Sequence, residues 1–128
     1  MARILIADDE EAERALVRAE LEAAGHELLY ASNGSVALRI FDSSPIDLVI
    51  TDLAMPSLNG LRLIAQIRER DYRVPIVAVS GVSPEQLERA EELGATVTLR
   101  KPYAPRRLLA AVEQALAAGP PPIRDVWS

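Results

Sequence analysis

The 128-residue sequence contains no cysteine, which excludes a disulfide scaffold, a thiolate metal site and a cysteine nucleophile. Aromatic residues are scarce, with one Trp, one Phe and three Tyr, so the core must be built from aliphatic side chains. The net charge is −5, and the sequence has neither a Lys/Arg-rich run nor an aromatic platform on which bases could stack. We therefore expect no direct binding to nucleic acid.

Long apolar runs are missing as well. No segment approaches the ~20 apolar residues that a membrane-spanning helix needs. The run at residues 4–7 is too short for the apolar part of a signal peptide. We expect a cytoplasmic protein without membrane association. An apolar content of 49% in 128 residues is enough for one domain with a real core, which we expect to be a monomer or a weak dimer.

Short apolar segments alternate with longer amphipathic ones along the chain. We expect strands at residues 3–7, 27–31, 48–51, 76–79 and 95–99. We expect helices at residues 10–24, from Asn33 or Ser35 to 41, from 60 through 67 at least, 84–93 and 105–118. Five such units predict a three-layer α/β fold, in which helices cover both faces of a doubly wound, five-stranded parallel sheet. The favoured strand order is 2-1-3-4-5, as in flavodoxin-like folds.

Local signals support the expected helices. Ser83 is predicted to cap the fourth helix, with Pro84 at its first position. Leu16 is expected to extend the buried stripe of the first helix, and Leu116 that of the last. Three acidic residues lie where the dipole of the first helix favours negative charge: Glu10, Glu11 and Glu13.

A polar residue follows each of four expected strands. Asp8 and Asp9 follow the first, Asp52 the third, Ser80 the fourth and Lys101 the fifth. The carboxyl ends of parallel strands lie at one edge of the sheet, so these side chains are expected to converge there. Each residue alone has an ordinary interpretation as a cap or a turn, but the whole set favours a functional site.

The chemistry of this set suits phosphoryl transfer to a carboxylate. Three carboxylates in one crevice repel each other, and a hard cation such as Mg²⁺, or Mn²⁺ in its place, relieves the repulsion. A lysine and a serine hydroxyl can contact phosphate oxygens, and an aspartate can form an aspartyl phosphate. A flavin-binding protein would need a phosphate loop where Asp8 and Asp9 stand, and an aspartate-based phosphatase a second acid where Ala54 stands. We therefore do not expect an enzyme, beyond catalysis of its own phosphorylation and dephosphorylation.

Two motifs carry a resemblance to a known family. Residues 52–56 read Asp-Leu-Ala-Met-Pro and are followed by Gly60, and residues 101–103 read Lys-Pro-Tyr. With the spacing of the strand-end residues, they make residues 2–118 resemble the receiver domain of bacterial two-component response regulators. We interpret residues 1–118 as this domain and residues 119–128 as a proline-rich C-terminal tail.

The resemblance implies a role for each site residue. Asp52 would accept the phosphoryl group, and Asp8 and Asp9 would hold Mg²⁺ together with Asp52 and the backbone carbonyl of Ala54. Ser80 would be the switch hydroxyl.

On the fifth strand, Lys101 would bind the phosphate, and its bond to Pro102 would be cis. One position departs from the family: Thr98 stands where an aromatic residue normally moves with the switch hydroxyl.

The resemblance also implies a function. A histidine kinase or a phosphotransfer protein would phosphorylate Asp52 in the presence of Mg²⁺, and the change would switch binding to a downstream protein. Two alternatives remain open: a phospho-independent interaction module on the same fold, and a receiver fragment of a larger regulator or hybrid kinase.

Overall fold

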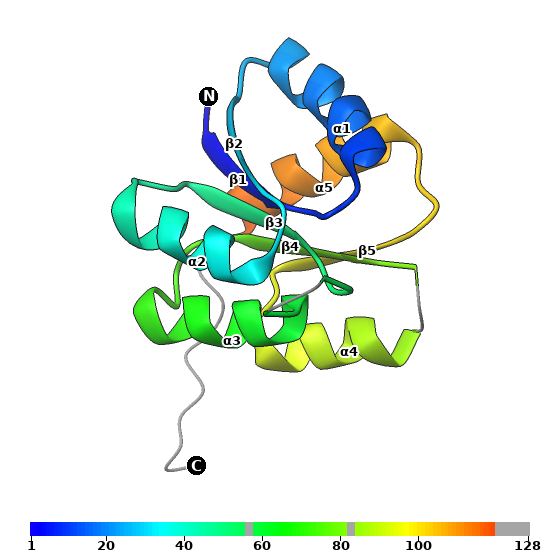
Figure 1. Ribbon diagram of the computed structural model, residues 1–128. Helices are drawn as coiled ribbons and strands as arrows, with labels where there is room; N and C mark the ends of the chain where they lie inside the picture. Colours follow the sequence, from blue (N-terminus) through cyan, green and yellow to red (C-terminus); the bar gives the residue numbers. More distant parts are fainter. Residues whose placement is uncertain (56–57, 82–83, 120–128) are drawn as a thin grey trace.

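The computed structural model describes residues 1–55, 58–81 and 84–119. Five strands and five helices alternate in this part of the chain (Figure 1). In chain order they are β1 (Arg3–Ala7), α1 (Glu11–Ala23), β2 (Glu27–Ala31), α2 (Gly34–Ser43), β3 (Leu48–Asp52), α3 (Gly60–Arg70), β4 (Ile76–Ser80), α4 (Pro84–Leu93), β5 (Val97–Arg100) and α5 (Pro105–Ala118).

The strands form one parallel sheet in the order β2-β1-β3-β4-β5, as the sequence predicted. Within it, Ile6 of β1 lies beside Tyr30 of β2 on one side and Ile50 of β3 on the other. All five residues of β3 and all five of β4 are buried, which agrees with their nearly continuous apolar sequences. The chain reverses its winding direction between β1 and β3, so the carboxyl ends of these two strands border a crevice.

Helices cover both faces of the sheet, α1 and α5 on one and α2, α3 and α4 on the other (Figure 1). Successive residues of a strand contribute to opposite faces: Ile4 and Ile6 pack towards α1 and α5, and Leu5 packs towards α2 and α3. Among the helices that the structure describes, none is long and apolar enough to cross a membrane.

Two expected core positions are wrong. Leu16 of α1 is 63% exposed and Leu116 of α5 is 37% exposed. The buried side of α1 is a narrow stripe at Val17 and Leu21, and Leu16 points away from it because neighbouring helical residues differ in direction by about 100°.

The fifth strand begins at Val97, two residues later than predicted. At Thr96 the side-chain hydroxyl, and not a backbone carbonyl, accepts the hydrogen bond from the backbone N–H of Ile76 at 3.0 Å. The N–H of Ala95 is used by the end of α4, where it donates to the carbonyl of Ala90 at 2.9 Å.

Asparagine side chains begin two of the helices. Asn33, one of the two candidates for α2, accepts from the N–H of Val36 at 2.9 Å, and Asn59 accepts from the N–H of Arg62 at 3.0 Å. The predicted cap at Ser83 lies outside the described residues.

Arg68 ties the α3–β4 and α4–β5 connections together, at the end of the sheet away from the expected site. Its guanidinium donates to the carbonyl of Gly94 at 2.7 and 3.0 Å, to that of Val74 at 2.7 Å and to that of Asp71 at 3.1 Å. One side chain thereby joins the end of α3 to the end of α4.

The start of α3 lies directly against the end of β3. A Cβ atom at Gly60 would stand 2.9 Å from the carbonyl carbon of Asp52, 2.5 Å from the Cα of Leu53, and closer still to the carbonyl oxygen of Asp52. The N–H of Gly60 donates to the carbonyl of Leu53 at 3.1 Å. Only glycine allows this approach, which holds the start of α3 against the end of β3.

We expect Gly60→Ala to lower the free energy of unfolding by about 1–3 kcal/mol, because the added methyl group meets backbone that cannot move aside cheaply. Urea denaturation monitored by circular dichroism measures this change. Arg62→Ala, on the exposed side of the same helical turn, is the matched control and should change stability by less than about 0.5 kcal/mol. Equal stability of Gly60→Ala and the control would contradict the close approach.

Candidate functional site

Asp52 is the last residue of β3, and its side chain is only 6% exposed. Its Oδ1 accepts a hydrogen bond from the backbone N–H of Ala54 at 3.1 Å, and its Oδ2 accepts from the ammonium group of Lys101 at 2.8 Å. Both oxygens of this buried carboxylate therefore have a donor, and the ammonium brings a neutralising charge.

Lys101 follows β5 and reaches across β4 to Asp52. Its backbone N–H donates to the carbonyl of Ser80 at 3.0 Å, which fixes the start of the side chain. Its Nζ contacts Glu13 Oε2 at 2.6 Å as well as Asp52. Burial alone would lower the pKa of Lys101, but the hydrogen bonds to Asp52 and Glu13 outweigh it and raise this pKa, so the ammonium stays charged.

Glu13 was not assigned to the site from the sequence, where it was interpreted as one of three acids favoured by a helix dipole. It lies on α1, one helical turn after Asp9, and forms the shorter of the two ion pairs of Lys101. Burial raises the pKa of Glu13, but hydrogen bonds involving Lys101 and Asp8 outweigh this effect and lower it. Its place in the first turn of α1, a few residues after Asp8 and Asp9, was the only sequence signal for its position.

Asp8 is also buried, with 7% of its surface exposed. Its Oδ1 accepts a hydrogen bond from the N–H of Glu10 at 2.8 Å. Burial raises the pKa of Asp8 to about 7; the Glu10 N–H and Lys101 oppose this change, and the Glu13 carboxyl adds to it. In the absence of a cation, Asp8 therefore holds its proton to a higher pH than an exposed aspartate does.

Two groups of three carboxylates share Asp52. In each of them, Asp8–Glu13–Asp52 and Asp9–Glu10–Asp52, one oxygen per residue lies within 4.8 Å of the others. The ammonium of Lys101 already pairs with two members of the first group. The second group has two exposed members, Asp9 and Glu10, and is the one open to a hard cation.

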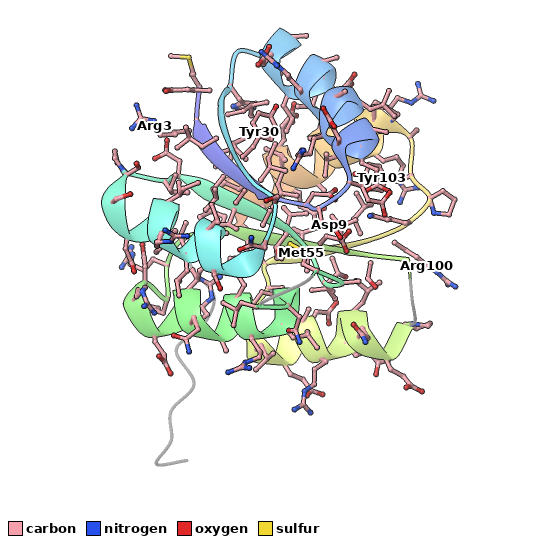
Figure 2. The ribbon with its side chains drawn as sticks, in the orientation of Figure 1. Arg3, Asp9, Tyr30, Met55, Arg100 and Tyr103 are labelled. Atoms are coloured by element: carbon pink, nitrogen blue, oxygen red, sulfur yellow. The ribbon has the colours of Figure 1, made fainter. Side chains whose placement is uncertain are left out.

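A hollow of about 480 Å³ adjoins this second group. Asp9 and Ala54 line it, together with Met55 and Asn59 of the β3–α3 connection and Gln86 of α4. Asp9 and Met55 lie close together in Figure 2, at the edge where the strands end. Asp9 and the backbone of Ala54 therefore border the same accessible space.

Ser80 ends β4 and is 1% exposed, on the strand next to Asp52. The peptide bond between Lys101 and Pro102 is cis, the geometry that the resemblance implied. Tyr103 lies beside this connection (Figure 2). Burial, followed by the charge of Glu13, raises the pKa of Tyr103 to about 12, so the phenol stays neutral.

Thr98, which stands where the family has an aromatic residue, makes a side-chain contact of its own. Its hydroxyl donates to Oε1 of Glu91 at 3.2 Å and so links β5 to α4. A polar contact between these two elements stands at the position where the family has a ring.

The sequence-predicted residues thus lie at one edge of the sheet. Asp52 and Lys101 are in direct contact, Asp8 and Asp9 flank Asp52 in two separate carboxylate groups, and Ser80 ends the intervening strand.

Comparison with known families identifies the kind of domain. A model of the response regulator receiver domain matches residues 4–113. The chain belongs to the response regulator receiver domain family. A receiver domain is a signalling module of two-component systems and not an enzyme in the ordinary sense.

Two curated relatives illustrate the range of proteins that carry such a domain. This receiver domain is 36% identical over 112 residues to the sensory/regulatory protein RpfC of Xanthomonas campestris pv. campestris, covering 84% of this chain and 15% of RpfC. It is 32% identical over 116 residues to the alkaline phosphatase synthesis transcriptional regulatory protein PhoP of Bacillus subtilis, covering 89% of this chain and 48% of PhoP. The chain therefore spans less than half the length of both relatives.

Solved structures match over nearly the whole receiver domain. A response regulator receiver domain protein from Clostridium thermocellum has a TM-score of 0.86 and 32% identity, covering 92% of this chain and 96% of that one. The chemotaxis response regulator CheY4 of Vibrio cholerae has a TM-score of 0.83 and 30% identity, covering 90% and 98%. The fold is thus that of CheY-like receivers.

Proposed function

We propose that this receiver domain accepts a phosphoryl group on Asp52 from a histidine kinase or a phosphotransfer protein. The observation that carries the proposal is the contact between the buried carboxylate of Asp52 and the ammonium of Lys101 at 2.8 Å. A buried acid with an adjacent lysine suits an acceptor, because the cation can follow the negative charge onto the transferred group.

The chemistry is a simple displacement. An oxygen of Asp52 attacks the phosphorus of the donor, a new P–O bond forms, and the bond from phosphorus to the donor's imidazole nitrogen breaks. The nitrogen leaves with the bonding electron pair, and Asp52 becomes an acyl phosphate. In this proposal Lys101 then donates to a phosphoryl oxygen, and the hydroxyl of Ser80, at the end of the adjacent strand, donates to another.

The donor set fits Mg²⁺. Asp9 and Asp52 supply carboxylate oxygens on the side that Lys101 leaves open, Ala54 can add its backbone carbonyl, and Asp8 lies next to them. A cation bound there would neutralise the charge that gathers on the phosphoryl oxygens during transfer. The residues themselves hold and orient Asp52, through the Ala54 N–H and the Lys101 ammonium.

The output is proposed to be a change in protein–protein interaction, because the family is a signalling module. The contact between Thr98 and Glu91 joins β5 to α4, two register positions before the pair of Ser80 and Arg100, and we propose it as a polar link between the end of β4 and the surface of α4. The domain can serve alone or as the receiver of a larger regulator, as in RpfC and PhoP.

Intact-mass measurement after incubation with acetyl phosphate and Mg²⁺ tests the proposal. Wild type should gain one phosphoryl group, and Asp52→Asn should gain none, because an amide oxygen does not replace the carboxylate nucleophile. Asp42→Asn, which alters an exposed aspartate on α2, is the matched control and should react like wild type.

Equal labelling of wild type and Asp52→Asn would place the acceptor elsewhere. No labelling of wild type, together with no response to beryllofluoride and Mg²⁺, would favour the phospho-independent interaction module.

A further inference from the structure

Glu13 occupies a position in the site that the proposed function does not explain. Its carboxylate forms a 2.6 Å contact with Lys101 Nζ, although the two residues lie 88 positions apart in the sequence. The side chain of Lys101 is 16% exposed and that of Glu13 29% exposed, so the pair is partly buried. The same Nζ contacts the acceptor carboxylate at 2.8 Å.

We propose that Glu13 is a positioning residue that competes with the phosphoryl group for Lys101 and so slows phosphorylation of Asp52. The inference rests on the proposed function of Asp52 and adds a residue of this chain that sets the rate.

The position of the ammonium, held between two carboxylates, explains the competition. A lysine ammonium has three N–H donors, and Glu13 and Asp52 each use one of them. To stabilise the transferred group, Lys101 must direct one N–H at a phosphoryl oxygen, which lies farther out than the carboxylate of Asp52. The bond to Glu13 restrains Nζ on the α1 side of Asp52, and Glu13 keeps its negative charge beside the new phosphoryl oxygens.

Removal of the negative charge of Glu13 should release Lys101 without leaving a cavity at position 13. Glu13→Gln keeps the length and shape of the side chain but replaces a charge-assisted bond with a weaker neutral one. With acetyl phosphate as donor, Asp52 forms a P–O bond and acetate leaves with the electrons of the broken bond. Lys101 would stabilise the charge in that transition state more completely in the variant.

The test compares rates of phosphorylation by acetyl phosphate with Mg²⁺, followed by intact mass. Glu13→Gln should react about tenfold faster than wild type, equivalent to ~1.4 kcal/mol of barrier. Glu11→Gln removes the same charge from an exposed position of α1 and should keep the wild-type rate. A rate for Glu13→Gln equal to or below that of wild type overturns the inference.

A double-mutant cycle separates competition for Lys101 from a purely structural role. In a Lys101→Met background, Glu13→Gln should change the rate by less than about twofold, because the shared partner is gone. A tenfold effect that persists without Lys101 rules out action through that residue.

A second readout is the affinity for beryllofluoride with Mg²⁺, measured by calorimetry on proteins that keep Lys101. Glu13→Gln should bind this phosphoryl mimic about tenfold more tightly than wild type, and unchanged affinity counts against competition. If wild type gains no phosphoryl group at all, or Asp52→Asn gains one, the proposed function fails. If wild type is labelled on Asp52 and the Glu13 variant behaves like it, only the role of Glu13 fails.

Discussion

Replacement of Lys101 by methionine is expected to lower the free energy of unfolding of the metal-free protein by about 3–5 kcal/mol at neutral pH, as for other broken buried ion pairs. The ammonium contacts two carboxylates, Asp52 at 2.8 Å and Glu13 at 2.6 Å. Methionine fills a similar volume but leaves both acids in a shielded pocket without a cation. Mutual repulsion and lost hydration then favour the unfolded chain.

Urea denaturation with EDTA, and again with Mg²⁺, measures this effect. Excess Mg²⁺ should recover part of the loss, because it would bind the folded state through Asp52, one of the two acids that lose their cation, together with Asp9. Arg100→Met, at the adjacent exposed residue of β5, should shift stability by less than about 0.5 kcal/mol. A Lys101→Met protein as stable as the Arg100 variant would mean that the two ion pairs contribute nothing to the folded state.

Asp8→Asn is expected to stabilise the metal-free protein, by on the order of 2 kcal/mol at slightly alkaline pH. Burial, with a further contribution from Glu13, raises the pKa of Asp8 from 3.8 to about 7, so ionisation of this residue is costly in the folded state. Asparagine is neutral at every pH. Its oxygen can still accept from the Glu10 N–H, as Asp8 Oδ1 does at 2.8 Å, and its amide can donate to Glu13 as a protonated carboxyl would.

The same shift predicts the pH dependence of wild type. The folded state holds the Asp8 proton more tightly than the unfolded chain does, and this difference stabilises the fold. The stabilisation is full below the pKa of Asp8 in the unfolded chain and is lost as the pH rises through about 7. The pKa of Glu13 is lowered, so the stability that Glu13 contributes is lost only at acidic pH. The pKa of Lys101 is raised, so the stability that Lys101 contributes is lost only at strongly alkaline pH. Between about pH 5 and pH 7.5 the Asp8 effect therefore dominates, and metal-free wild type should become less stable.

Thermal unfolding with EDTA at several pH values checks both statements. Asp8→Asn should flatten the profile of wild type above about pH 5. Asp9→Asn, which alters the exposed neighbour, should leave the profile unchanged yet weaken Mg²⁺ binding. If wild type gains stability from pH 5 to pH 7.5 without metal, Asp8 is not the group that controls it.

The sequence predicted the sheet and most of the site because both depend on local rules. Apolar runs that stop at Asp8, Asp52 and Ser80 mark strand ends, and parallel strands place those ends at one edge. The caps at Asn33 and Asn59 follow from short polar side chains before helical segments.

The contacts between distant side chains could not be predicted in this way. Glu13 reaches Lys101 only because α1 packs beside α5, the helix that follows the Lys101 connection. An acidic residue in a first helical turn has an ordinary local explanation. Thr98 was recognised as a departure from the family, but its bond to Glu91 depends on how α4 packs against β5. The exposure of Leu16 likewise depends on the rotation of α1 about its own axis.

Arg68 anchors one end of α4. Its guanidinium holds the carbonyl of Gly94, just beyond the last turn of α4, by bonds of 2.7 and 3.0 Å. The opposite end of α4 begins at Pro84, shortly after the buried Ser80. We therefore expect a displacement that starts at Ser80 to act at the Pro84 end of α4. It would be resisted near the other end, where Arg68 binds Gly94 and Thr98 binds Glu91. We expect α4 to swing about Gly94 and not to translate as a whole, with the largest movement of its surface near Gln86, beside the hollow that Asp9 lines.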